Sequence, residues 1–181
     1  MLKSKKMLNN CSYKSYLVMK KKILIIYLVF NFFIYSSAFS QCNSGNCKNG
    51  FGFYVGPNSN KYEYRGEFKE GLFHGRGVFT SINGNIYTGE FKEDSFHGQG
   101  VFTSSDGNIY TGEFKEGLFH GQGVFTSING EKYEGEHLNN KRHGQGVFTY
   151  DGNIYTGEFK EGRFHGQGVF TSINGEKYEG E

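Results

Sequence analysis

Hydrophobic and polar positions alternate along most of the chain, and a phrase of 23 residues carries the pattern. Residues 110–115 alternate between Tyr, Gly or Phe on one face and polar side chains on the other, which predicts a half-buried β-strand. A second alternating run covers 118–126, and Glu116-Gly117 between the two runs predicts a tight turn. Asn129-Gly130 predicts a further turn. Each phrase is therefore expected to form one β-hairpin, joined to the next hairpin by another turn.

The phrase recurs, beginning at Tyr64, Tyr87, Tyr110, Tyr133 and Tyr155. Four of the five full copies have 23 residues and one has 22. A fixed period of this size indicates a repeat architecture, in which neighbouring units supply the stability that a single hairpin lacks. We predict an all-β fold, an elongated and twisted ribbon or solenoid of tandem β-hairpins with about 23 residues per repeat.

Glycines stand beside the aromatic positions of every repeat. A glycine inside a strand leaves room for a ring from a neighbouring strand, so we expect the Tyr, Phe and Gly rows to form one apolar seam. In the copy that begins at Tyr133, His137 and Arg142 stand where other copies have Phe. This copy is either a specialised surface or a repeat that tolerates polar residues. The candidate interaction surface along the seam comprises Tyr64, Phe68, Tyr87, Phe91, Tyr110, Phe114, Tyr133, His137, Arg142, Tyr155 and Phe159.

The first 40 residues differ from the rest, because they contain none of the 28 glycines. They hold a lysine-rich start, an apolar run over 23–35 and small residues at 38–40, which predicts a signal peptide removed before Gln41. Met19 is an alternative start for that leader. An uncleaved anchor, or a lipoprotein acylated at Cys42, is the alternative to removal. Residues 41–181 keep 13 of the 20 basic residues and all 18 acidic ones, a net charge of −5 that argues against nucleic acid as a partner.

Cys42 and Cys47 are the two cysteines that follow the leader. A pair of cysteines in an exported chain predicts a disulfide, here closing a short loop. A metal site is the alternative, and it is disfavoured because no histidine stands nearby. We expect 41–63 to be an N-terminal cap with half a repeat. The five full repeats and a truncated sixth then fill 64–181.

The shared phrase, Tyr-x-Gly-Glu-Phe-x-x-Gly-x-x-His-Gly-x-Gly-x-Phe, resembles the MORN (membrane occupation and recognition nexus) repeat. The resemblance covers 64–181 and a half repeat that begins at Asn49. It implies an elongated ribbon of β-hairpins that serves as a scaffold, a dimerisation device or a protein-binding module, and membrane or phospholipid contact has been proposed for some members. No segment of this chain corresponds to the catalytic domains that some members carry, and the leader and cysteines suggest an exported protein of bacterial type.

Two polar rows run along the repeats and could carry chemistry. Neighbours in the histidine row are expected about 9–10 Å apart, too far to share a zinc ion, so packing or hydrogen bonding at a strand bend is favoured over metal binding. The glutamate row repeats one environment, whereas paired acid–base catalysis needs two, so a solvated face partly paired with lysines is expected. The histidines are His74, His97, His120, His143 and His165; the glutamates are Glu67, Glu90, Glu113, Glu136 and Glu158; the lysines are Lys69, Lys92, Lys115 and Lys160.

The sequence therefore predicts a non-enzymatic, exported protein-interaction or scaffold module that needs no cofactor. Its partner would be another protein or a second copy, docking along the ribbon or by strand addition at the edge near Tyr178. The second hypothesis is a peripheral protein that binds membrane phospholipid. The third and least favoured is an enzyme or accessory protein acting on glycans or lipids. The predicted location is secreted, periplasmic or on the outer surface.

Overall fold

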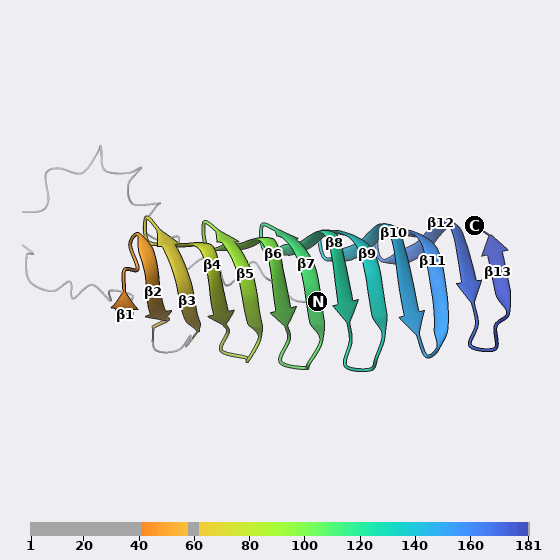
Figure 1. Ribbon diagram of the computed structural model, residues 1–181, viewed down its shortest axis with the longest axis horizontal. Helices are drawn as coiled ribbons and strands as arrows, with labels where there is room; N and C mark the ends of the chain where they lie inside the picture. The colour runs from red at the N-terminus through yellow and green to blue at the C-terminus, as the bar shows by residue number, and fades with distance from the viewer. Residues whose placement is uncertain (1–40, 58–61, 181) are drawn as a thin grey trace, which may run out of the picture.

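The computed structural model describes residues 41–57 and 62–180, which form a single open antiparallel sheet whose thirteen strands follow the order of the chain (Figure 1). This confirms the predicted all-β ribbon of tandem hairpins. The predicted signal peptide and the alternative start at Met19 lie outside the described residues. The strands are β1 (Gln41–Gly45), β2 (Gly50–Val55), β3 (Glu63–Lys69), β4 (Leu72–Thr80), β5 (Ile86–Lys92), β6 (Ser95–Thr103), β7 (Ile109–Lys115), β8 (Leu118–Thr126), β9 (Lys132–Leu138), β10 (Lys141–Tyr150), β11 (Asn153–Lys160), β12 (Arg163–Thr171) and β13 (Lys177–Gly180).

Two kinds of turn alternate along the ribbon. The turn inside a repeat has positive φ at both central residues, 52° at Glu116 and 79° at Gly117, which is the backbone of a two-residue type I′ turn. The turn between repeats is longer, and its Ser127 and Glu131 are joined by a backbone hydrogen bond of 2.8 Å. In the repeat of 22 residues this longer turn becomes a second two-residue turn, with φ of 50° at Asp151 and 77° at Gly152.

Neighbouring turns are linked along both edges of the ribbon. The Gly117 amide donates to the Phe96 carbonyl of the preceding repeat at 3.0 Å. On the other edge, the Ile128 amide donates to Asn108 Oδ1 at 3.0 Å. Equivalent bonds recur between other repeats, so each turn supports the next and the hairpins cannot move independently.

A β-bulge bends every full hairpin near its first turn. Gly112 lies opposite Gly123, but the next residue, Glu113, lies opposite His120, so two residues of β8 have no partner on β7. One of them, Gly121, has a φ of +55°, a left-handed conformation that suits glycine. The bend brings distant rings together. Phe96 is paired with Phe91, which would lie about 13 Å along a straight strand from Tyr87, yet the Phe96 and Tyr87 ring centroids are 3.9 Å apart.

The ribbon begins with a hairpin that extends the same sheet. Strand β2 pairs with β3 in the register that later repeats use, Gly52 opposite Gly66 and Tyr54 opposite Tyr64. Cys42 and Cys47 form a disulfide that joins β1 to the loop before β2. No helix in the described part of the chain is long and apolar enough to cross a membrane.

Candidate functional site

The aromatic seam predicted as an interaction surface lies inside the bent ribbon, so it is not open to a partner in this structure. The four tyrosines Tyr64, Tyr87, Tyr110 and Tyr133 are at most 1% exposed. The bend is the physical reason, because it folds the Phe side chains next to the first turn over the tyrosine rings. Of the remaining predicted residues, Arg142 is half-buried, and the buried ones are Phe68, Phe91, Phe114, His137, Tyr155 and Phe159.

Each core tyrosine is held by ring stacking and by its hydroxyl. Tyr110 stacks on Phe119 with centroids 3.8 Å apart. Its hydroxyl lies 3.0 Å from the Glu113 carbonyl and 3.2 Å from the His120 carbonyl, both acceptors at the bulge. Burial raises the pKa of this phenol well above its usual value, so it stays a donor. The ring also covers Gly123, where a Cβ would lie 2.4 Å from the hydroxyl oxygen, so the predicted role of glycine beside the rings is confirmed.

The glutamate row also belongs to the bulge, which corrects the prediction that lysines are its partners. Glu113 Oε1 accepts the Gln122 amide at 3.1 Å, and the carboxylate lies over Gly121. Glu67, Glu90 and Glu136 accept the equivalent amides. Within the described residues, ion pairs join Lys132 to Glu134 and Lys141 to Glu161, and neither involves this row. The carboxylates therefore satisfy backbone groups that the bulge leaves without a partner.

The histidine row marks the same bulges. The carbonyls of His74, His97, His120 and His143 accept the tyrosine hydroxyls. His120 Nδ1 and His143 Nδ1 are buried without a hydrogen-bond partner. In the described part of the chain, no three His, Cys, Asp or Glu side chains come together in a way that could hold a metal ion. The row thus lies at the strand bend, where packing was predicted.

The opposite face of the sheet, here called the outer face, exposes two rows of β-branched side chains. Along one row, successive strands present Val and Thr in turn; along the other, Thr and Ile alternate. Side chains in the rows are half-buried or exposed, with Val101 38% and Ile109 41% exposed. We call the ten uncharged side chains on β4 to β8 the plate: Val78, Thr80, Ile86, Thr88, Val101, Thr103, Ile109, Thr111, Val124 and Thr126.

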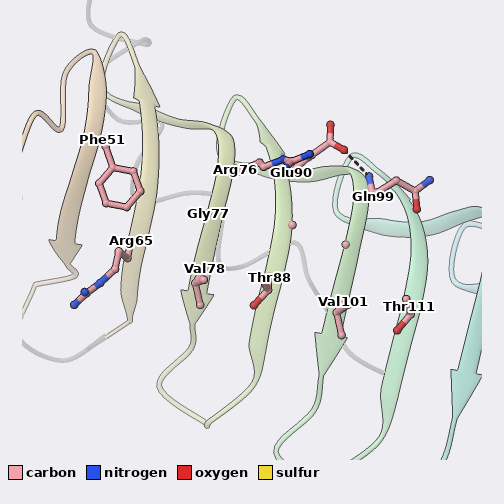
Figure 2. A pocket seen from close by; sticks show the side chains of 12 residues that line it. Phe51, Arg65, Arg76, Gly77, Val78, Thr88, Glu90, Gln99, Val101 and Thr111 are labelled. Carbon is pink, nitrogen blue, oxygen red and sulfur yellow. Dashed lines mark hydrogen bonds between the residues drawn. The ribbon is translucent and has the colours of Figure 1, made fainter.

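A shallow groove of about 570 Å³ runs along the plate beside its Val and Thr row (Figure 2). Its floor is backbone at Gly77, Gly89 and Gly100, whose missing Cβ atoms would point to the tyrosine side. Arg65 lies near one end, with its guanidinium carbon 4.9 Å from the centre of the Phe53 ring. The other lining residues are Phe51, Arg76, Val78, Thr88, Glu90, Gln99, Val101 and Thr111.

The repeated hairpin agrees with a known protein family. A comparison with protein-family models matches the MORN repeat to residues 64–86, 87–109, 110–132, 133–153 and 155–177, more than half of the chain. The chain belongs to the MORN repeat family. No curated protein matches it. The family residues Tyr, Gly, Glu, Phe and His-Gly-x-Gly are the ones that build the bend and its core, which leaves the outer face to residues that vary between repeats.

The fourth MORN repeat differs from the others in the core. His137 takes the place of a Phe and lies edge-on to Tyr110 and Tyr133, with centroid distances of 4.9 and 5.0 Å. Burial, together with the nearby Arg142 charge, lowers the pKa of His137 to about 4. Arg142 takes the place of the Phe that stacks on tyrosine elsewhere, and it donates to the Gly162 carbonyl at 3.2 Å. The buried aromatic core is divided here, into a part that ends at Phe114 and a part that starts at Tyr133.

Sequence reasoning did not identify the outer face as a candidate surface. Attention to the residues that recur in every copy favours the core, because the core requires the same residue in each repeat. The signal was present in the residues on either side of each Tyr or Phe, such as Ile109 and Thr111 beside Tyr110. Alternation at period two places them together on the face opposite the ring.

Proposed function

We propose that this chain is a non-enzymatic interaction or scaffold module that binds another polypeptide through its outer face. The observation that carries the proposal is that the plate is uncharged and partly exposed, with no layer of described residues covering it, while the aromatic seam is fully used in the core. A regular face of apolar and hydroxyl side chains suits a polypeptide surface, where apolar contact supplies affinity and hydroxyls supply hydrogen bonds. The non-enzymatic part rests on the glutamate row, whose carboxylates bind backbone amides.

We further propose that the protein is exported and acts in an oxidising compartment, either secreted, periplasmic or on the outer surface. The Cys42–Cys47 disulfide supports this, because disulfides persist where thiols are not continuously reduced. The leader composition of residues 1–40 supports it independently.

Photo-crosslinking at single positions in the cells that make the protein tests the proposed surface. A benzophenone amino acid would replace Thr88 or Val101 on the plate, and Lys92, near the turn edge, in a matched control. Thr88 and Val101 should give the same crosslinked polypeptide, and Lys92 should not. Crosslinks from Lys92 alone, or from none of the three positions, would overturn the assignment of the outer face.

A second candidate function, contact with a phospholipid surface, is favoured by the turns between repeats. Ile82, Ile128 and Ile173 lie at these turns and are 64, 69 and 69% exposed. Exposed isoleucines in a row along one edge could enter the boundary of a bilayer. Sedimentation with vesicles of neutral and of anionic lipid tests this candidate. Binding that is lost when the three isoleucines are changed to Ser would favour it over the outer face.

A further inference from the structure

Charged strands border the plate, and their charges are in opposite order. On β3, Glu63 and Arg65 stand in the Ile row and the Val row respectively. On β9, six strands away, Lys132 and Glu134 occupy the same two rows, so the signs are exchanged. Lys132 and Glu134 are exposed and 3.0 Å apart. The plate is therefore an uncharged surface between two borders that are electrostatically complementary to each other.

We propose that two copies of this chain pack with their outer faces together, related by a two-fold axis that runs parallel to the strands and passes through β6. The axis reverses the order of strands and keeps each row opposite itself. Strand β3 then faces β9 of the second copy, so Glu63 faces Lys132 and Arg65 faces Glu134. The proposal rests on the proposed function, since it names a second copy as the polypeptide that binds the outer face.

The same axis also matches the uncharged side chains. Strand β4 faces β8 of the second copy, which brings Val78 opposite Val124, and β5 faces β7, which brings Ile86 opposite Ile109. On β6 each residue faces itself, Val101 in one row and Thr103 in the other. Apolar side chains thus meet apolar ones and hydroxyls meet hydroxyls. An axis along the ribbon would instead place valines over threonines, and each charged strand over itself.

The expected contact is small. Seven strands at about 4.8 Å each and a width of about 14 Å give close to 500 Å² per copy, or about 1,000 Å² in total. An interface of this area is at the lower end of specific association, so a dimer with a micromolar Kd is expected. The opposite charges at both borders fix the register more than they add affinity, because exposed ion pairs contribute little.

Charge exchange on the purified full chain, followed by sedimentation velocity over a concentration series, tests the register. Lys132→Glu with Glu134→Lys gives β9 the same charge order as β3 while keeping an opposite-charge pair within the strand. This variant should raise the dimer Kd about tenfold or more at low ionic strength. Adding Glu63→Arg with Arg65→Glu should return the Kd to within about threefold of the starting value. The matched control, Lys177→Glu with Glu179→Lys on β13, lies outside the seven strands and should leave the Kd unchanged.

Circular dichroism and the thermal midpoint should be the same for all variants, since every exchanged side chain is exposed. A dimer that the β9 exchange does not weaken, or that the double exchange does not restore, would overturn the proposed face-to-face register. A chain that stays monomeric up to about 500 μM would overturn self-association itself, because this area predicts a micromolar Kd. If the plate still crosslinks to a different polypeptide in that case, the proposed function stands without this inference; if it does not, both fail.

Discussion

Protonation of His137 is expected to weaken the ribbon in mild acid. This side chain is 5% exposed, and its pKa in the fold is about 4, compared with 6.5 for an unperturbed histidine. Because the folded pKa is the lower one, the folded chain favours neutral imidazole. The associated stability is fully present above pH 6.5 and is lost as the pH falls towards 4. At pH 5 the loss is about 2 kcal/mol, from 1.36 kcal/mol per pKa unit and the partial titration of the two states.

The charged group next to His137 is the Arg142 guanidinium, and the tyrosines Tyr110 and Tyr133 face the ring from both sides. Burial raises the pKa of Tyr133 to about 12, so neither phenol supplies a negative charge in this range. A protonated His137 would therefore lie next to a like charge and apolar rings, with no carboxylate partner among the groups identified around it. This is the physical reason for the expected loss of stability in acid.

Urea unfolding at pH 7 and pH 5, for the native chain and for His137→Phe, measures this loss. Phe is the residue that other repeats have at the position, and it does not titrate. The free energy of unfolding of the native chain should fall by about 2 kcal/mol more between the two pH values than that of the variant. Comparing the two proteins cancels the titration of groups that they share. An equal pH dependence in the two proteins would refute the reasoning.

Three further substitutions probe the bend and the turns. Gly123→Ala places a Cβ against the Tyr110 ring and should lower the free energy of unfolding by about 2–4 kcal/mol, whereas Gly180→Ala, with open space around it, should stay within about 0.5 kcal/mol; urea titration of both checks this. Glu113→Ala removes the acceptor of a backbone amide at the bulge and should cost about 1–2 kcal/mol by the same measurement, with no loss if water replaces the carboxylate. Glu116→Asn suits the positive φ of 52° in the type I′ turn and should raise the thermal midpoint, and a lower midpoint would contradict the turn assignment.

The sequence was sufficient to predict the hairpins, their turns and the rows of tyrosine and glycine, because period-two alternation and turn residues are local signals. It was not sufficient to predict the bulge. His120, Gly121 and Gln122 continue the alternation in the sequence, and the shift of two residues appears only when β8 is paired with β7. The glutamate assignment failed for the same reason, since the amide that Glu113 accepts becomes available only at the bulge.

The candidate surface was misplaced because alternation shows which residues share a face but not which face is covered. An aromatic face of a single open sheet can be exposed to a partner or closed on itself. Here the bend closes it, and Phe119 stacks on Tyr110 to complete the core. The outer face becomes the accessible one, with its plate of Val, Ile and Thr residues.

Oxidative footprinting of the native tyrosines tests most directly the central claim that the aromatic seam is core and the outer face is the accessible surface. Hydroxyl radicals modify exposed rings, and mass spectrometry reports the modification at each residue. Tyr150 and Tyr178, at 50 and 60% exposed, should be modified quickly, and Tyr64, Tyr87, Tyr110 and Tyr133 should be protected at least tenfold until the protein unfolds. Comparable rates for the two groups in the native protein would show that the seam is open and would contradict the account.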